Sequence, residues 1–410
     1  MNPIFSALLR NKTGAVLVAV QVAISMAILA NALHIVNVRQ EVAARPSGIA
    51  DEKSVFYITS RYLKRETAEY DRAVQQREID LLRALPGVAG VAITSQMPMS
   101  DSGSTRSVSL DRKQVNQSAG TATYRASDTL VATMQLKLVE GRDFTPADVL
   151  TVDLQVSDEF PKSVIITKAL ATKLWPDQAS VIGKTLLFGV GEKARPTQVI
   201  GVIERLQSSS AQTGEAGEFS SILPFHSLGS TPGGMYVVRT AVGERDRVMK
   251  EAEAAMSKSA GEPVIIEAKT TENDRKERYR ADMALSWTLI AVSLLLLVIT
   301  ASGIVGMASL WVTQRRKQIG VRRALGARRA DILRYFITEN VMITGAGVVS
   351  GVVLAIGLNQ LLVAQLEMTR LPLVYLLAGS GVFFALGIIA VYGPAWRAAS
   401  ISPALATRSA

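Results

Sequence analysis

Four long stretches without a charged side chain constrain this fold more than any other feature of the sequence. Residues 13–38, 283–314, 340–366 and 371–396 contain no Asp, Glu, Lys or Arg over 26, 32, 27 and 26 residues. About 20 apolar residues in a helix span the hydrocarbon core of a bilayer, so each stretch is long enough to cross it. The sequence therefore excludes an entirely soluble protein and predicts four transmembrane helices.

The net charge of +10 indicates how these helices are oriented. Segments 1–12, 315–339 and 397–410 together carry twelve basic and two acidic residues, whereas 39–282 carries 32 of each. The positive-inside rule therefore predicts a cytoplasmic location for both termini and an outer location for 39–282. Because the large segment is neutral, it offers no basic face to a nucleic acid, and we exclude nucleic-acid binding as the reason for the pI of 9.8.

The first apolar stretch is predicted to remain in the membrane as a signal anchor. It is longer than the apolar region of a cleaved signal peptide, and the polar residues Gln40 and Glu41 follow where small residues would mark cleavage. The chain has no cysteine, so the outer segment has no disulfides. Its core must then be stabilised by burial alone, for which a domain of about 240 residues is large enough.

The outer segment reads as a large α+β domain. A strand, a charged helix ended by Pro86 and Gly87, and a second strand follow one another near its start, and the same order recurs near its end. Two such β-α-β units predict a split, ferredoxin-like subdomain with a strand-rich insertion between its halves. The expected strands are 55–59, 88–95, 163–167, 184–188, 198–203, 235–240 and 263–268, the expected helices are 64–85 and 244–258, and 207–217 is expected to be a flexible loop.

The charged run from Lys269 to Asp282 leads directly into the second apolar stretch. Nine of its fourteen residues are charged, and it contains neither Pro nor Gly. A solvated linker and a rigid helical stalk continuous with the membrane span both fit this composition.

These patterns divide the chain into consecutive parts. The expected parts are the N-terminus with the first span (1–38), the outer core domain (39–268, with 39–95 and 235–268 as the split subdomain and 96–234 as the insertion), the stalk (269–282), the second span (283–314), a cytoplasmic segment (315–339), the third and fourth spans (340–366 and 371–396) and a cytoplasmic tail (397–410).

No catalytic or metal-binding constellation is apparent in the sequence. His34 lies in an apolar stretch and His226 in what reads as a loop bounded by prolines, and neither has a partner at metal-ligand spacing. The run Gly183-Lys184-Thr185 is similar to the end of a phosphate-binding loop, but Gln178 stands where that loop requires glycine. We therefore expect no catalytic residue, no metal site and no nucleotide site here.

The membrane stretches carry small residues at helix-packing spacing and no ionisable residue apart from His34. Charged residues mark substrate and ion paths in many transporters, so their absence argues against a substrate site at the membrane midplane. The small residues predict close helix packing, and we expect the first helix to pack against the second helix of its own chain or of a partner. An alanine stripe facing lipid is the alternative. The candidate packing residues are Ala15, Ala19, Ala23, Ala27, Gly347 and Gly351.

The cytoplasmic segment combines paired arginines with apolar residues that a purely topogenic loop would not need. Ile319, Val321 and Leu325 are interleaved with glycines between Arg315-Arg316-Lys317 and Arg328-Arg329. An apolar ridge on a short helix flanked by arginine suits docking into a groove of another protein. The candidate interface consists of Ile319, Gly320, Val321, Arg322, Arg323, Leu325, Gly326 and Ala327.

This segment resembles the loop between the second and third membrane helices of FtsX-like ABC-transporter permeases. The family pattern is Arg-x-x-Glu-Ile-Gly-x-Arg-x-Ala-x-Gly-Ala followed by Asp-Ile, and Gln318 here replaces the glutamate. The tail 394–404 resembles the family's ending, although Thr407 stands where leucine is usual. In the outer segment, the runs 141–144, 164–166, 174–175, 182–185 and 199–202 resemble the MacB-like periplasmic core domain.

The resemblance implies a permease that is not itself an enzyme. Such permeases work as dimers with cytoplasmic ABC ATPase subunits, which bind the ATP and Mg²⁺, so no cofactor is expected on this chain. It implies a bacterial inner-membrane protein, with a second permease copy or paralogue and membrane lipid as partners. A periplasmic adaptor and an outer-membrane channel complete MacB-like pumps. The implied function is mechanotransmission for efflux of drugs, peptides or metabolites; an FtsX-like signalling or cell-wall-regulating permease and LolC/LolE-like lipoprotein release are the alternatives.

Overall fold

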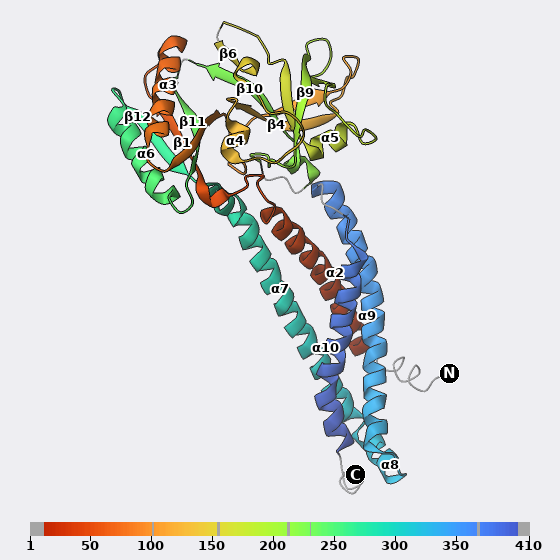
Figure 1. Cartoon of the computed structure of the whole chain (residues 1–410). Helices are drawn as coiled ribbons and strands as arrows, with labels where there is room; N and C mark the ends of the chain where they lie inside the picture. The colour runs from red at the N-terminus through yellow and green to blue at the C-terminus, as the bar shows by residue number, and fades with distance from the viewer. Residues whose placement is uncertain are drawn as a thin grey trace. The chain divides into compact units, whose positions relative to one another are not determined.

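The computed structural model describes residues 12–100, 102–153, 156–210, 214–229, 231–366 and 370–400. The chain forms two compact units, which are described separately: a membrane unit (Met1–Gln40 with Asp282–Ala410) and an outer unit (Glu41–Ala281). The helix and strand labels follow Figure 1.

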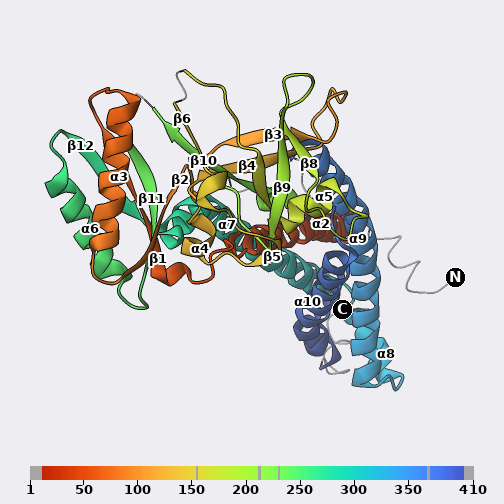
Figure 2. The same ribbon diagram turned by 45° about the horizontal axis from the view of Figure 1, so that its top comes forward.

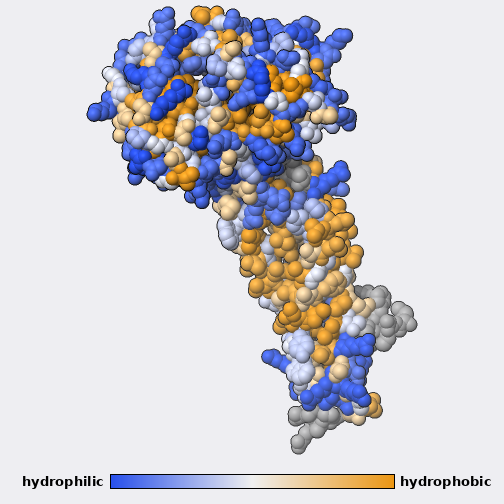
Figure 3. All heavy atoms as spheres, in the orientation of Figure 1, coloured by the Kyte–Doolittle hydropathy of each residue, from blue (hydrophilic) through white to orange (hydrophobic). Residues whose placement is uncertain are grey.

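Four helices in the described residues are long and apolar enough to cross a membrane. They are α2 (Lys12–Ala43), α7 (Thr271–Gln314), α9 (Arg329–Leu366) and α10 (Leu373–Ala399). Helices α2, α7 and α9 each contain one of the four uncharged stretches, and α10 covers all but the first two residues of the fourth, so the prediction of four apolar helices is confirmed. Their surface forms an apolar band that gives way to hydrophilic surface at the end where α8 (Arg316–Ala324) lies (Figure 3).

The charged run that precedes the second span is helical. Residues from Thr271 onward belong to α7, a single helix of 44 residues that continues through the span to Gln314. With no Pro or Gly before Gly303, nothing in this part of the sequence interrupts the backbone hydrogen-bond ladder. Of the two arrangements that fit the composition of this run, the structure has a helix continuous with the membrane span.

The outer unit contains the two predicted β-α-β units. The first is β1 (Val55–Tyr62), α3 (Ala68–Ala84) and β2 (Val88–Thr94), and the second is β11 (Gly233–Thr240), α6 (Arg245–Ser259) and β12 (Val264–Lys269). The strands of the two β-α-β units alternate in the sheet, in the order β12-β1-β11-β2, and every neighbouring pair is antiparallel.

The two long helices of these units cover the same face of the four strands. Apolar side chains of α3 (Leu82) and α6 (Val248, Met256) pack with Phe56 and Tyr236 of the sheet in one buried cluster. Both helices lie beside this part of the sheet in Figures 1 and 2. Thr67 begins α3 by accepting a hydrogen bond from the backbone N–H of Tyr70, which satisfies one of the free donors of the first turn.

The insertion extends the same sheet. Strand β4 joins β2 through the single pair Thr94–Ala126, and the order continues as β4-β3-β8-β9-β7-β10-β6, with β5 on β9. The bounds are β3 Thr105–Ser109, β4 Ala119–Ala126, α4 Leu130–Met134, β5 Leu138–Gly141, β6 Leu150–Asp153, β7 Ser163–Thr167, α5 Lys168–Leu174, β8 Thr185–Phe188, β9 Arg195–Ile203 and β10 Ser220–Leu228, with short 3₁₀ helices at Glu52–Ser54, Pro146–Asp148 and Glu215–Glu218.

One expectation about the insertion was wrong, and a second holds only in part. His226 lies in β10 and not in a loop, because Pro224 fits the strand without breaking it. The stretch expected to be a flexible loop is well packed at its start: Gln207 and Ser208 are buried, and the backbone N–H of Gln207 donates to the carbonyl of Ser47 at 2.8 Å. Residues 211–213 of that stretch lie outside the described residues.

Candidate functional site

Within segment 315–339, helix α8 links α7 to α9. Gly326, just after α8, has φ +99°, a left-handed conformation that a side chain would strain. The next helix then starts at Arg329, where the Asp331 carboxylate accepts a hydrogen bond from the backbone N–H of Arg328 at 2.9 Å. A glycine and a capping aspartate thus form a tight turn between α8 and the start of α9.

The apolar residues expected to form one ridge on α8 are partly buried and partly exposed. Ile319 is 5% exposed and belongs to the apolar cluster of the membrane helices, and Gly320 is buried beside it. Val321 and Leu325, in contrast, are 48% and 82% exposed. The three apolar residues therefore do not form one continuous ridge: Ile319 anchors α8, and the outward apolar surface is that of Val321 and Leu325.

The remaining candidate residues surround this outward surface. Arg322 is exposed, with its guanidinium 5.1 Å from the centre of the Tyr335 ring, while Arg323 and Ala327 are half-buried. Gln318, at the position of the family glutamate, is exposed. The arrangement presents one apolar side chain at the tip of α8 among cations, which suits an apolar pocket with an acidic rim on another protein.

Two charged residues at the base of α8 were not among the candidates. Arg315 Nη1 donates to Glu339 Oε2 at 2.8 Å and to the Tyr335 hydroxyl at 3.3 Å. The Glu339 side chain is only 1% exposed. The signal was present in the sequence, because Glu339 is one of only two acids in the basic segments and stands directly before an uncharged stretch.

The alanine stripe of α2 lies against the glycines of α9 in the same chain. A Cβ placed on Gly347 would lie 2.8 Å from the Ala19 carbonyl oxygen, and one on Gly351 would lie 3.0 Å from that of Ala23. Ala23 and Ala27 are 4% and 6% exposed, and Ala15 is half-buried. The expected contact with the second helix, α7, also exists, but other residues of α2 make it.

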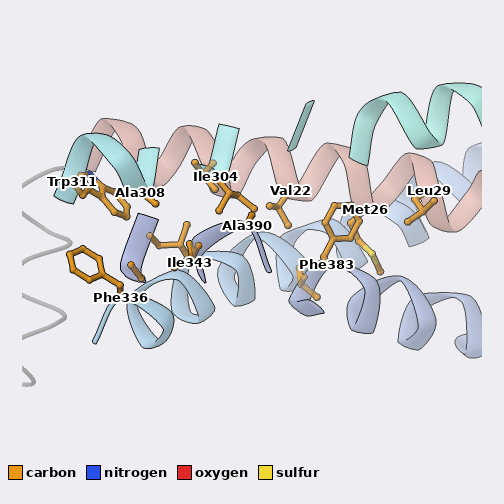
Figure 4. Close-up of a cluster of buried hydrophobic side chains, with 14 of the residues drawn as sticks. Val22, Met26, Leu29, Ile304, Ala308, Trp311, Phe336, Ile343, Phe383 and Ala390 are labelled. Carbon is orange, nitrogen blue, oxygen red and sulfur yellow. The ribbon is translucent and has the colours of Figure 1, made fainter. Parts of the chain in front are cut away.

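Polar and apolar contacts both join α2 to α7. The hydroxyls of Ser25 and Thr300 are 3.0 Å apart, and Gly303 leaves room for Gln21. The Arg39 guanidinium forms an ion pair with Asp282. Between the four helices lies one apolar cluster, whose labelled members in Figure 4 are Val22, Met26, Leu29, Ile304, Ala308, Trp311, Phe336, Ile343, Phe383 and Ala390.

In the outer unit, Arg275 ties the first turns of α7 to the chain that follows α2. Its Nη1 donates to the carbonyls of Ala43 and Arg45 at 3.0 and 2.6 Å, and its Nη2 bonds the Glu52 carboxylate at 2.7 Å. One turn further along, Tyr279 is buried with Val42 and Met99. Burial raises the pKa of the Tyr279 phenol. This cluster, Arg275 with its three partners, is called the junction below.

The start of α7 also bonds the four-stranded part of the sheet. The Tyr57 hydroxyl of β1 donates to Asp274 Oδ1 at 3.0 Å. Burial and the Asp274 carboxylate raise the pKa of Tyr57, so the hydroxyl keeps its proton and remains a donor.

The two histidines and the phosphate-loop-like run have local structural roles. The His34 ring packs against that of Tyr375 with centroids 5.2 Å apart, and His226 Nε2 contacts Gln75 Oε1. Gly183 has φ +82° in the turn before β8, and Lys184 Nζ lies 5.8 Å from the centre of the Trp175 ring. Within the described residues, no three His, Asp or Glu side chains are grouped as metal ligands.

Two family models match the chain. Residues 18–257 match the MacB-like periplasmic core domain, and residues 290–403 match the FtsX-like permease C-terminal region.

Several curated relatives are exporters by name. The macrolide export ATP-binding/permease protein MacB of Agrobacterium fabrum is 27% identical over 282 residues, covering 65% of this chain and 40% of the relative. The protein of that name from Syntrophobacter fumaroxidans is 36% identical over 29% of this chain and 17% of the relative. The pyoverdine export ATP-binding/permease protein PvdT of Pseudomonas fluorescens is 27% identical over 66% of this chain and 40% of the relative. The chain thus matches less than half the length of each.

Among solved structures, the periplasmic region of MacB from Actinobacillus actinomycetemcomitans is similar over 58% of this chain and 97% of that chain. The sequence identity is 15% and the TM-score is 0.34.

Proposed function

Since this chain belongs to the family of ABC-transporter permeases with a MacB-like periplasmic core domain and an FtsX-like C-terminal region, we propose that it couples ATP hydrolysis by a separate cytoplasmic ATPase to a conformational change outside the membrane. The work done there is efflux of a drug, peptide or other metabolite from the periplasm. The names of the curated relatives, macrolide and pyoverdine exporters, support efflux over the signalling and lipoprotein-release alternatives.

The observation that carries this proposal is the pairing of an exposed apolar tip with an unbroken helix. Leu325 is 82% exposed on the α8 segment, which directly follows α7. Helix α7 has 44 residues and is therefore about 66 Å long, enough to pass through a bilayer and beyond it. A displacement of α8 is thus proposed to pass directly into α7.

The absence of charge in the membrane stretches supports work outside the bilayer. A substrate site at the midplane would need polar or charged side chains around a cavity. An apolar cluster lies between the four helices, and the pocket beside Asn340 within it has a volume of only about 10 Å³. Transport by mechanotransmission requires no path through that cluster.

The proposed orientation follows from the distribution of arginines. Segment 315–339 carries eight basic and two acidic residues, so it and both termini are assigned to the cytoplasm of a bacterial inner membrane. The outer unit then lies in the periplasm. Its four-stranded part is proposed to be a split ferredoxin-like subdomain, and the interlocked strand order β12-β1-β11-β2 supports this assignment.

Further partners complete the proposal. The permease acts as a dimer with a second copy or a paralogue, and ATP and Mg²⁺ are bound by the partner ATPase. A periplasmic adaptor and an outer-membrane channel carry the substrate onward. The exposed apolar side chains of α7, such as Leu294, Leu295 and Val298, are covered by lipid or by the second permease.

The test is co-purification of an affinity-tagged chain from native membranes, with the proteins that accompany it identified by mass spectrometry. Leu325→Asp is expected to remove the ATPase from the complex, because a charge would replace the apolar tip. Val242→Asp is the matched control, since Val242 is similarly exposed, at 87%, but lies in the outer unit. An ATPase retained equally by both variants, or absent from the wild-type preparation, overturns the proposal.

A further inference from the structure

The ion pair at the base of α8 lies where the short helix meets the membrane helices. Arg315 is the single residue between the end of α7 at Gln314 and the start of α8 at Arg316. Its partner Glu339 lies on α9. The 2.8 Å bond between them therefore joins the start of α8 to a membrane helix 24 residues further along the chain.

Because the Glu339 side chain is buried, its carboxylate must be paired with a cation. A carboxylate that is 1% exposed beside apolar residues such as Phe336 is stable only with a cation close by. Arg315 supplies it, whereas the second oxygen, Oε1, has no hydrogen-bond partner in the part of the chain that the structure describes. Glu339 therefore depends on one side chain, and that side chain moves with α8.

Arg315 is itself held in place from both sides. Its backbone N–H donates to the Trp311 carbonyl at 3.0 Å, and its own carbonyl accepts from Ile319 at 2.9 Å, so the helical bonding of α7 passes through Arg315 into α8. Its guanidinium lies 5.8 Å from the centre of the Trp311 ring. The Tyr335 hydroxyl of α9 accepts a second bond from Nη1 at 3.3 Å. A displacement of α8 cannot leave this guanidinium where it is.

We infer that Arg315 and Glu339 are the positioning pair through which a displacement of α8 is passed to α9. This inference rests on the proposed function and deepens it, because it names the contact that links the ATPase-facing tip to the membrane helices. The tip and the pair have separate tasks: Leu325 binds the partner, and Arg315 with Glu339 transmits the movement. Loss of the pair then uncouples the complex without dissociating it.

The experiment uses the complex purified from native membranes and a single cysteine at Gln365, an exposed position at the far end of α9 in a chain that otherwise has none. The rate at which a membrane-impermeant maleimide labels this cysteine is measured with and without ATP. In the wild-type background we expect ATP to change the rate by about fivefold or more, the usual range for coupling between two sites. Glu339→Gln and Arg315→Gln should both abolish this change while the ATPase remains bound.

The charge-reversed double variant Arg315→Glu/Glu339→Arg separates transmission from stability. It restores the opposite charges and should restore the ATP-dependent change in labelling. Arg334→Gln is the control, since it removes an exposed cation from α9 that forms no ion pair with any residue the structure describes, and it should behave as the wild type. If Glu339→Gln does not accumulate, Arg315→Lys, which keeps the charge but removes the guanidinium, replaces it and should weaken the change.

Either of two results overturns the inference: a wild-type response in Glu339→Gln or Arg315→Gln, or a double variant that remains unresponsive. Simultaneous loss of the ATPase and of the response also counts against it, because the pair would then serve binding. Failure of the proposed function looks different, since in that case the wild-type preparation itself contains no ATPase.

Discussion

Gly347 of α9 faces the backbone of Ala19 of α2, and a Cβ on Gly347 would lie 2.8 Å from the Ala19 carbonyl oxygen. Real Cβ atoms do not approach a carbonyl this closely, so either α2 or α9 must move when this glycine is replaced. Close approach of helix backbones is the main attraction between helices in lipid, and a forced separation weakens it.

Gly347→Ala should therefore destabilise the membrane unit by about 1–3 kcal/mol, the usual cost of overpacking. Gly357→Ala on the same helix is the control, because nothing lies within 4 Å of the Cβ it would add. It should be neutral or stabilising by up to about 1 kcal/mol, since alanine favours a helix. Thermal unfolding of both variants in the same detergent provides the comparison, and equal melting temperatures would show that α2 and α9 are not packed through this glycine.

The hydroxyls of Ser25 and Thr300 predict a crosslink between α2 and α7. The two oxygens are 3.0 Å apart, so cysteines at these positions should form a disulfide within one chain under mild oxidation. Ile24→Cys paired with Thr300→Cys is the control, because Ile24 is 48% exposed on another side of α2. Peptide mapping by mass spectrometry detects the disulfide. Equal crosslinking of both pairs would mean that α2 has no fixed orientation toward α7.

The sequence indicated which residues of α2 lie at a helix contact better than it indicated which helix they contact. The four-residue spacing of Ala15, Ala19, Ala23 and Ala27 predicted close helix contact, and in the structure the backbones of Ala19 and Ala23 lie close to Gly347 and Gly351. Spacing alone does not say which helix lies opposite. The partner is decided by the glycines at 347 and 351, whose missing side chains admit the α2 backbone. Such complementarity between distant residues is visible only once both helices are in place.

In the outer unit and in α8, too, local sequence patterns predicted some features, whereas others depend on distant neighbours. Strands with continuous β-branched runs, such as Ser163–Thr167, were predicted at their observed bounds. Strand β4, rich in alanine and threonine, was not predicted, because its burial comes from neighbours on both sides and not from its own pattern. Likewise Ile319 and Leu325 look equivalent in the sequence, and only the membrane helices, by burying Ile319, distinguish them.

Asp148 is expected to stabilise the outer unit at neutral pH and to lose this effect in acid. Its carboxylate accepts two bonds from Arg142, at 2.8 and 3.0 Å, and others from Thr145. These bonds, with Arg142 the main cause, hold the pKa of Asp148 well below its ordinary value of 3.8. Since the folded-state pKa is lowered, the stabilisation is present above the unfolded pKa and disappears as pH falls through the folded one.

Asp148→Asn should therefore cost about 1–2 kcal/mol at neutral pH and progressively less as the pH falls below about 4. Chemical unfolding of the two proteins across this pH range measures the difference. Asp177→Asn, an exposed aspartate with no ion pair found in the described residues, should change little at any pH. A constant difference between Asp148→Asn and wild type would contradict the assigned cause.

Buried Glu78 predicts a pH dependence of the opposite sign. It accepts hydrogen bonds from the hydroxyls of Ser60 and Tyr236, each at 2.6 Å, and from Tyr62 at 3.2 Å. Burial nevertheless raises the pKa of the Glu78 carboxyl above its ordinary value of 4.5. The folded state then holds the proton more tightly than the unfolded chain, so the contribution of Glu78 to stability falls as pH rises from 4.5 toward the folded pKa.

Glu78→Gln, which cannot ionise, should remove this fall. The free energy of unfolding of the variant minus that of wild type should increase as the pH is raised from about 4 to 7. Glu69 on the same helix is exposed, and no hydrogen bond of its side chain is found in the part of the chain that the structure describes, so Glu69→Gln should show no such trend. A difference that stays constant or decreases with pH would mean that the hydroxyl donors outweigh burial.

The junction around Arg275 should be the least replaceable contact of the helical stalk. Arg275 donates to two backbone carbonyls, those of Ala43 and Arg45, and to the Glu52 carboxylate. One guanidinium thus holds all three acceptors. Arg275→Gln removes these charge-assisted bonds and should destabilise the outer unit by about 2–3 kcal/mol.

Backbone amides of residues 43–54 should exchange hydrogen faster, because the carbonyls that Arg275 held are then free to move. Lys276→Gln is the matched control on the next residue of α7. The ion pair of Lys276 with Glu272 is exposed, so this change should cost at most about 0.5 kcal/mol and leave exchange in 43–54 unchanged. Hydrogen exchange measured by mass spectrometry on the full chain in detergent distinguishes the two variants. Equal protection of residues 43–54 in both would mean that apolar packing of Tyr279 with Val42, and not Arg275, fixes the start of α7 to the chain that leaves α2.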